Sequence, residues 1–325
     1  MRRILVSGAS GIVGYGILRS LRRVRRPWSL IGTSIYEDSV AQGFCDIFER
    51  APPTGDEAYM DWLLHTIKKH QVELIVPGIE IDLYKWADNV STIESSGAAA
   101  LLNTPALIKL CKDKWEFYEA LRATALPCAI ESSLGDDFDH LKSRFGLPFL
   151  LKPRRGFGSK GLVRVDGPET FAKHRGDVGR LLMAQPIVGS DNEEFTTAAF
   201  GDGSGGFFAT MTLKRLLSKD GFTDKAEVVA TDEFVDTTAA LCQQFRPTGP
   251  TNFQFRKCVD GIKLLEINPR ISSSTSIRAA FGYNESAMAV EQLLEGRAPH
   301  QPAVARGRAV RYVDEHIFYE DSIHL

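Results

Sequence analysis

Residues 251–270 read TNFQFRKCVDGIKLLEINPR, and the alternation of polar and apolar residues in two runs of this stretch predicts a β-hairpin. In the first run, Asn252 and Gln254 alternate with phenylalanines. In the second run, Glu266 and Asn268 alternate with aliphatic residues. Because successive side chains of a strand point to opposite faces, each polar pair shares one face of its strand.

The length of the turn decides which of these polar residues meet across the hairpin. A three-residue turn over 259–261, with its glycine in the left-handed conformation, would place Gln254 opposite Glu266 and Asn252 opposite Asn268. A two-residue turn would shift the pairing by one residue and put Gln254 and Glu266 on opposite faces. We predict the longer turn because it gathers four side-chain oxygen ligands on one face.

Oxygen ligands of this kind suit a hard metal ion. Glu266 is the charged member of the set, and Mg²⁺ favours one or two carboxylates together with amide oxygens, waters and substrate phosphates. Pro269 prevents further ladder pairing after Asn268, which places Arg270 just beyond this face, where its guanidinium could meet a phosphate or a carboxylate. The alternative interpretation is an ordinary edge hairpin whose outer face is polar.

The glutamine before the turn and the sequence LEINPR after it resemble the metal-binding signature of the ATP-grasp superfamily, especially the branch of the carbamoyl phosphate synthetase large subunit. Members of that superfamily use ATP to phosphorylate a carboxylate, and an amine or another nucleophile then attacks the acyl phosphate. The resemblance implies that Gln254 and Glu266 hold Mg²⁺, or Mn²⁺, on the triphosphate and that Asn268 completes the shell. It also implies that Arg270 steadies the transferring phosphate or the acyl phosphate.

A second motif lies upstream, where the strand Phe149–Pro153 leads into a glycine-rich loop over 154–161. Glycines let backbone N–H groups approach phosphate oxygens closely, and Lys152 adds a point charge. The loop is not a Walker A motif, because no Gly-Lys-Ser/Thr ending and no helix follow it. Under the resemblance it is the ATP-grasp lid, in which Gly156, Gly158, Ser159 and Gly161 surround the phosphates. The alternative is a mobile basic hairpin.

The resemblance assigns further residues to the nucleotide and the phosphates. It implies that Lys114 reaches the nucleotide phosphates, that Met183, Ala184, Gln185 and Ile187 contact adenine, that Glu194 rather than Glu193 takes the ribose hydroxyls, and that Arg215 and Lys225 lie near the γ-phosphate and the acyl phosphate. Arg278 follows a serine-rich helix start that suits an anion, so we assign it to the substrate carboxylate. The alternatives are a surface lysine at 114, core packing for Met183 and Ile187, and a solvated charge pair for Arg215 and Lys225.

The N-terminal region predicts a doubly wound α/β domain. A buried strand over 4–6 precedes the glycine turn Gly8–Gly16 and an amphipathic helix, a pattern that is also compatible with an NAD site whose ribose acid follows the strand over 29–34. The strand over 72–76 ends just before Glu80. Because ligands gather at the carboxyl ends of such strands, Glu80 could bind the amine substrate, or it could serve only as a first-turn acid of the next helix.

Length and composition limit the possibilities further. We expect 325 residues to form a pre-ATP-grasp α/β domain over 1–110, a lid subdomain over 111–180 and a C-terminal ATP-grasp domain over 181–325, a combination of α/β and α+β folds. A net charge of −2 argues against nucleic acid or an anionic membrane as the main partner. Five scattered cysteines without a Cys-x-x-Cys pair favour a reducing cytoplasm over a disulfide framework or a zinc site. The apolar run at the N-terminus is too short for a signal peptide.

The sequence therefore predicts an ATP-dependent, ADP-forming carboxylate–amine ligase of small-molecule biosynthesis that uses ATP and Mg²⁺. Its expected partners are small carboxylate and amine substrates, with a homodimer left open. Carbamoyl phosphate synthesis itself is disfavoured, because neither a second copy of the unit nor a glutaminase motif is present. The alternatives are an NAD-dependent oxidoreductase and a non-catalytic ATP-binding protein.

Overall fold

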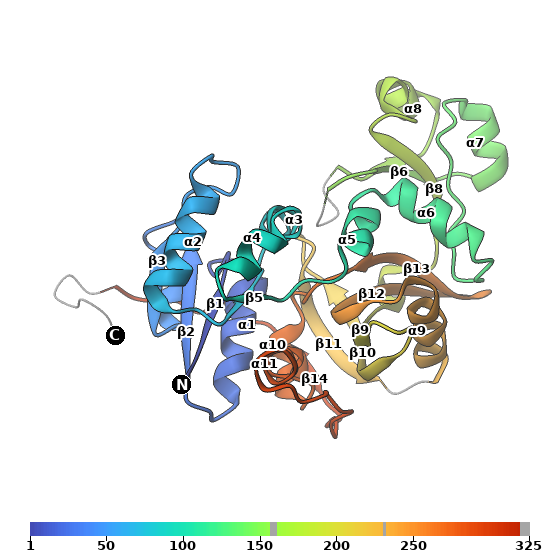
Figure 1. The fold of residues 1–325 in the computed structure, drawn as a ribbon. Coiled ribbons are helices and arrows are strands. Elements are labelled where there is room, and N and C mark those ends of the chain that lie inside the picture. The colour runs from blue at the N-terminus through green and yellow to red at the C-terminus, as the bar shows by residue number, and fades with distance from the viewer. Residues whose placement is uncertain (157–160, 230–231, 319–325) are drawn as a thin grey trace.

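The computed structural model describes residues 1–156, 161–229 and 232–318, and these residues form three sheets (Figure 1). The first sheet is parallel and has the strand order β3-β2-β1-β4-β5. Its strands are β1 (Arg2–Val6), β2 (Trp28–Ser34), β3 (Ile47–Arg50), β4 (Leu74–Val76) and β5 (Ala99–Ala100). This order confirms the doubly wound N-terminal sheet, although β3 was not predicted.

Helices cover both faces of this sheet. They are α1 (Ile12–Arg23), the short η1 (Val40–Gly43), α2 (Tyr59–His70), α3 (Glu80–Asp88) and α4 (Val90–Ser95). Leu63 of α2, Trp86 of α3 and Ile93 of α4 pack in one buried cluster on one face. Ile17 and Leu18 of α1 belong to a different cluster on the other face. In the described part of the chain, no helix is both long and apolar enough to cross a membrane.

The second sheet has three antiparallel strands in the order β7-β6-β8 and carries its own apolar core. Its elements are α7 (Phe138–Phe145), β6 (Phe149–Pro153), β7 (Val163–Val165), α8 (Pro168–His174), η2 (Arg175–Asp177) and β8 (Leu182–Pro186). The predicted division placed β8 in the C-terminal domain, but β8 pairs with β6 in this sheet. The helices α5 (Pro105–Lys112) and α6 (Lys114–Ala123) pack against the core of the third sheet instead. The domain boundaries themselves stay a prediction.

The third sheet has six strands in the order β13-β12-β9-β10-β11-β14, and each neighbouring pair is antiparallel. Its elements are η3 (Asp191–Glu193), β9 (Glu194–Asp202), β10 (Phe207–Leu217), β11 (Thr223–Val229), α9 (Asp232–Phe245), β12 (Thr248–Cys258), β13 (Gly261–Asn268), α10 (Thr275–Ala280), α11 (Glu285–Glu295) and β14 (Arg308–Val310). β11 includes Lys225, which was assigned to the phosphates.

One apolar core joins the first and third sheets. Ile17 of α1, Ile277 of α10 and Val290 of α11 belong to the same buried cluster as Val76 of β4 and Phe200 of β9. In Figure 1, α1, α10 and α11 lie together between the N-terminal sheet and the six-stranded sheet. The N-terminal domain is therefore packed against the sheet that carries the hairpin, on the face from which Asn252 projects.

The glycines of the N-terminal turn allow close contact between backbone segments. A Cβ added to Gly14 would lie 2.4 Å from the Gly8 carbonyl oxygen. A Cβ added to Gly78 would lie 2.1 Å from the Ser7 carbonyl oxygen and 2.8 Å from the Gly14 Cα. Close packing at the carboxyl edge of the parallel sheet thus accounts for the glycines at 14 and 78.

We predict that Gly78→Ala destabilises the protein by about 1–3 kcal/mol or more, because the added methyl group meets backbone atoms that cannot turn aside. The matched control is Gly55→Ala, where an added Cβ meets nothing within 4 Å. We expect the control to change the free energy of unfolding by less than about 0.5 kcal/mol in urea denaturation. Equal stability of both variants would contradict this account.

Candidate active site

The turn of the hairpin differs from the prediction. Cys258 pairs with Gly261, so the turn has two residues rather than three. Continued without interruption, this pairing would place Gln254 opposite Leu265 and leave Glu266 on the other face. The expectation of a three-residue turn was therefore wrong, although the pairing deduced from it is observed.

A β-bulge in β13 restores the predicted register. The pairing shifts directly after Gln254, and Leu265 is the inserted residue without a cross-strand partner. Beyond the bulge, Gln254 lies opposite Glu266 and Asn252 lies opposite Asn268, as predicted. The four polar side chains therefore start from the same face of the sheet.

The bulge also provides a contact for Lys152 of β6. The Leu265 carbonyl oxygen accepts a hydrogen bond of 3.2 Å from Lys152 Nζ. Burial lowers the pKa of Lys152 to about 8, although the nearby Glu266 carboxylate favours the charged ammonium. Lys152 of the three-stranded sheet and Glu266 of the hairpin are thus neighbours across the two sheets.

Glu266 lies among cations. Burial by itself would raise the pKa of Glu266, but the charges of Lys152, Lys114 and Arg270, with a hydrogen bond of 3.0 Å from Asn268 Nδ2, outweigh it. The pKa of Glu266 consequently lies below its usual range, and the side chain is a carboxylate at neutral pH. The positive charges around Glu266 would also stabilise other negative groups that bind beside this carboxylate.

Arg270 links this face to the N-terminal domain. Arg270 Nη2 forms an ion pair with Glu80, the first residue of α3, and lies 3.4 Å from Asn268 Oδ1. Tyr84 lies one helical turn after Glu80, and burial together with the Glu80 charge raises the pKa of Tyr84 to about 12. Two predicted site residues from separate domains, Glu80 and Arg270, therefore meet.

A second ion-pair network lies beside Gln254. Arg215 Nη2 donates to Gln254 Oε1 at 2.7 Å, and its Nε and Nη2 donate to Glu194 Oε1 at 3.1 and 2.8 Å. Arg256 donates to the other oxygen of Glu194 at 3.1 and 3.3 Å. Both carboxylate oxygens of Glu194 are thus engaged by guanidinium groups, which argues against the prediction that Glu194 takes the ribose hydroxyls.

The glycine-rich loop is tied to the start of α6. Lys114 Nζ donates to the Gly156 carbonyl oxygen at 2.6 Å, and the Lys114 N–H donates to the Arg154 carbonyl oxygen at 2.8 Å. Asp113 caps α6 and accepts hydrogen bonds from Arg154 at 3.0 and 3.2 Å and from Arg155 at 3.2 Å. Lys114 and Gly156, which were both predicted to lie at the nucleotide phosphates, are therefore in contact.

Two of the predicted loop residues, Gly158 and Ser159, lie outside the described residues. Gly161 ends the loop with a φ of 75°. A Cβ there would lie 3.0 Å from Pro153 Cγ, so both the positive φ and this contact favour glycine.

The predicted adenine strand is β8, and part of its backbone is already paired. The Ala184 N–H and carbonyl groups both hydrogen bond to Ser133, at 2.8 and 2.9 Å. The Ala184 carbonyl thus already accepts one hydrogen bond, and its contact with adenine stays a prediction. Met183 is fully buried, Gln185 Nε2 donates to Ser132 Oγ at 2.7 Å, and Ile187 is half-buried.

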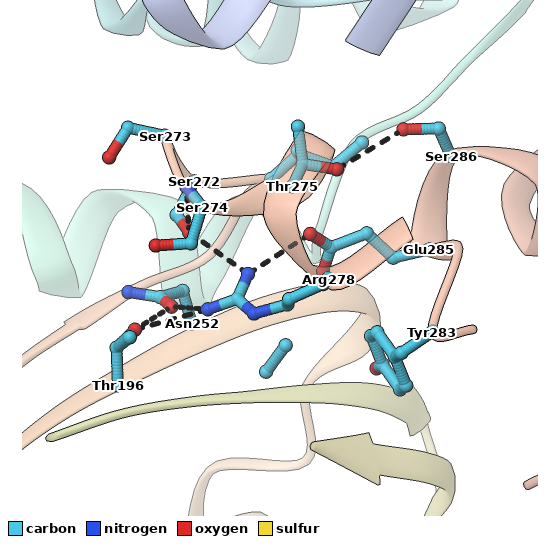
Figure 2. A network of polar contacts seen from close by, with 12 residues as sticks. Thr196, Asn252, Ser272, Ser273, Ser274, Thr275, Arg278, Tyr283, Glu285 and Ser286 are labelled. Carbon is cyan, nitrogen blue, oxygen red and sulfur yellow. Dashed lines mark hydrogen bonds and ion pairs between the residues drawn. The ribbon is translucent and has the colours of Figure 1, made fainter. Parts of the chain in front are cut away.

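Arg278 was predicted to bind the substrate carboxylate, and the structure corrects this (Figure 2). Its side chain is 0% exposed and forms an ion pair of 3.0 Å with Glu285. Its other contacts are Ser272 Oγ at 3.0 Å, Thr196 Oγ1 at 3.1 Å and Asn252 Oδ1 at 2.6 Å. Arg278 joins α10 to α11 and to the sheet beneath them, and so serves the packing of the domain.

Lys225 also lies apart from the site. Leu216 is its partner across β10 and β11, whereas Arg215 pairs with Ala226. Directly opposed residues share a face, so Lys225 and Arg215 project from opposite faces of the sheet. The prediction that both lie near the transferred phosphate is therefore wrong for Lys225.

Two residues of the site were missed by the sequence analysis. Arg256 follows Gln254 by two positions on β12, and the same alternation that selected Gln254 puts Arg256 on its face. Asp113 directly precedes a helix, where an aspartate is a common N-cap, and this signal was available as well.

Comparisons with known proteins identify the fold. Residues 205–316 match a family model described as ATP-grasp in the biosynthetic pathway with Ter operon. The structure superposes on N5-carboxyaminoimidazole synthetase from Staphylococcus aureus with a TM-score of 0.72 and 16% identity, over 93% of this chain and 80% of that one. The chain has the ATP-grasp fold. The superfamily resemblance of Gln254 and LEINPR is thereby confirmed.

Other solved ATP-grasp structures are similar to a comparable degree. Biotin carboxylase from Campylobacter jejuni, solved as a βγ-ATP complex, gives a TM-score of 0.72 at 15% identity, over 94% of this chain and 74% of that one. The biotin carboxylase domain of Hydrogenobacter thermophilus 2-oxoglutarate carboxylase, solved with MgADP, gives 0.71 at 13% identity, over 94% and 73%. No curated protein sequence matches the chain.

Two residues of this ATP-grasp hairpin have side chains that suit a hard divalent cation as ligands. Glu266 supplies a carboxylate. The Asn268 amide donates to Glu266 through its nitrogen and would have to turn its oxygen, which faces Arg270, toward the ion. Asn252 does not fit, because its Oδ1 accepts from both Arg278 and Thr196, each at 2.6 Å. Its Nδ2 is buried without a partner among the described residues. Of the four oxygens expected on this face, that of Asn252 is therefore committed to packing.

We predict that Arg278→Met destabilises the protein by about 3–5 kcal/mol, because it leaves the buried Glu285 carboxylate without its cation. The control is Arg180→Met, which breaks an exposed ion pair with Asp177 and should cost less than about 1 kcal/mol. Urea denaturation measures both. Unchanged stability of Arg278→Met would show that the ion pair does not anchor the fold.

Proposed function

We propose that this protein is an ATP-dependent ligase that joins a carboxylate to an amine through an acyl phosphate, releasing ADP and phosphate. The observation that carries the proposal is the ionised Glu266 on the hairpin of an ATP-grasp fold, surrounded by Lys152, Lys114 and Arg270. A metal-bound triphosphate brings the negative charge that such a group of cations neutralises. The cofactors of the proposed reaction are therefore ATP and Mg²⁺.

The residues of the chain contribute mainly charge and position. Phosphoryl transfer passes through a loose transition state, so neutralising and orienting the phosphates supplies most of the rate effect. Lys152, Lys114 and Arg270 would hold the phosphates, and Glu266 and Asn268 would hold the metal. When bound, the metal supplies Lewis-acid polarisation of the phosphoryl oxygens. No general base is required if the attacking amine arrives neutral.

We assign the substrates to the place where Arg270 meets Glu80. This ion pair lies at the carboxyl edge of the parallel sheet, next to the point where the strand order reverses between β1 and β4. A substrate carboxylate would compete with Glu80 for the guanidinium, and a substrate amine would compete with Arg270 for the carboxylate. A small hollow with a volume of about 10 Å³ adjoins Arg270 and is lined mostly by aliphatic and proline side chains, among them Val76, Leu101 and Pro250. It has room for about one water molecule, so a substrate would have to widen it.

The alternatives are less well supported. An NAD-dependent oxidoreductase would use the N-terminal glycine turn and would leave the cations around Glu266 without a role. A non-catalytic ATP-binding protein would keep nucleotide binding without ADP release that depends on substrates. A biosynthetic ligase in the cytoplasm accords best with the residues present.

Thermal stabilisation and ADP release test the proposal together. We predict that Mg-ATP and Mg-ADP raise the melting temperature of the protein whereas NAD does not. Glu266→Gln should keep the fold and lower the rate of ADP formation by roughly a hundredfold or more, because the metal loses its charged ligand. The control is Glu73→Gln, which breaks an ion pair with Arg2 away from the hairpin. Stabilisation by NAD alone, or normal turnover of Glu266→Gln, would overturn the proposal.

We further predict that Lys152→Met weakens Mg-ADP binding by roughly 10- to 100-fold, since a charged hydrogen-bond donor to phosphate is lost. Lys263→Met is the matched control, because Lys263 lies on the same hairpin but donates to the Pro127 carbonyl oxygen instead. Isothermal titration calorimetry measures both affinities. If Lys152→Met bound Mg-ADP as tightly as Lys263→Met, Lys152 would not contact the phosphates.

A further inference from the structure

Gln254 lies directly opposite Glu266, yet its amide oxygen is already committed. Arg215 Nη2 donates to Gln254 Oε1 at 2.7 Å, which is the oxygen that would have to coordinate a metal. A metal at its usual distance of about 2.1 Å from that oxygen would lie within roughly 5 Å of a guanidinium nitrogen. Two cations this close repel each other, more strongly in a buried site than in water.

Arg215 cannot easily move away from Gln254. It is 5% exposed and is held by two hydrogen bonds to Glu194, whose other oxygen is held by Arg256. Displacing the guanidinium would leave the buried Glu194 with one of its two cations removed, which is costly. The Arg215 guanidinium is therefore a fixed part of the fold and stays beside Gln254.

The other side of Glu266 differs from the Gln254 side. Asn268 Oδ1 lies 3.4 Å from Arg270 Nη2, a long contact for a charged hydrogen bond. The main partner of Arg270 is Glu80, and this pair is more exposed than the pair of Arg215 with Glu194. The Asn268 oxygen is thus much less committed than the Gln254 oxygen.

We propose that this face binds a single divalent cation, through Glu266 and Asn268, and that Arg215 supplies the positive charge on the Gln254 side that a second metal ion would otherwise bring. This inference rests on the proposed function, since the cation arrives with the nucleotide. Under this proposal Gln254 orients Arg215 and is no metal ligand, in contrast to the role that the resemblance implies.

Equilibrium dialysis of the full chain against Mn²⁺ and a non-hydrolysable ATP analogue tests the inference. The ratio of retained Mn²⁺ to retained nucleotide gives the number of metal ions per nucleotide. The electron paramagnetic resonance spectrum reports whether neighbouring Mn²⁺ ions are coupled. We expect a ratio of about one and an uncoupled spectrum. A ratio of two with a coupled pair, the arrangement of sites whose metals lie about 3.5–4 Å apart, would overturn the inference while supporting the proposed function.

Two variants show whether Arg215 is the cause. We expect Arg215→Met to raise the ratio toward two, because the Gln254 and Glu194 oxygens are released. Arg256→Met removes a cation from the same Glu194 without touching Gln254, and it should keep the ratio at one. An unchanged ratio in Arg215→Met, with the nucleotide retained, would overturn the role of Arg215. Failure of the unsubstituted protein to retain any nucleotide would instead overturn the proposed function, and the inference with it.

Discussion

The register of the β12–β13 hairpin is the constraint on which the candidate site depends. A two-residue turn alone would separate Gln254 from Glu266, and one inserted residue, Leu265, brings them to the same face. The same insertion directs the Leu265 carbonyl to Lys152 of another sheet. A single local irregularity therefore sets both the ligand face of the hairpin and its contact with the strand before the glycine-rich loop.

Buried charges on this face divide into two groups with different roles. Around Glu266, several cations surround one carboxylate, which leaves positive charge for an incoming anion. Around Glu194 and Arg278, the charges are paired with one another and have almost no exposed surface. Groups of the first kind can act on a ligand, whereas groups of the second kind fix the strands and helices from which the first group projects.

The sequence was most informative where short patterns carry their own geometry. Alternation along one strand located Gln254 and Glu266, and the order of a Lys-Pro strand, glycine loop and Asn-Pro-Arg ending indicated the fold. It could not reveal the bulge, because nothing in the local pattern separates a three-residue turn from a two-residue turn with an insertion further on. It also misplaced Arg278, since burial of that residue depends on Thr196, which is distant in the sequence. Lys225 was misplaced because β11 itself was not predicted.

The distribution of apolar clusters has a mechanical consequence. The first and third sheets share one core through α1, α10 and α11, whereas the three-stranded sheet encloses a separate core of its own. Polar contacts connect this second unit to the rest of the chain, among them those of Lys152 with Leu265 and of Arg154 with Asp113. By their apolar packing, the described residues thus form two units rather than three. A displacement of the smaller unit would change the position of Lys152 relative to Glu266 but not the Arg270–Glu80 contact, which lies within the larger unit.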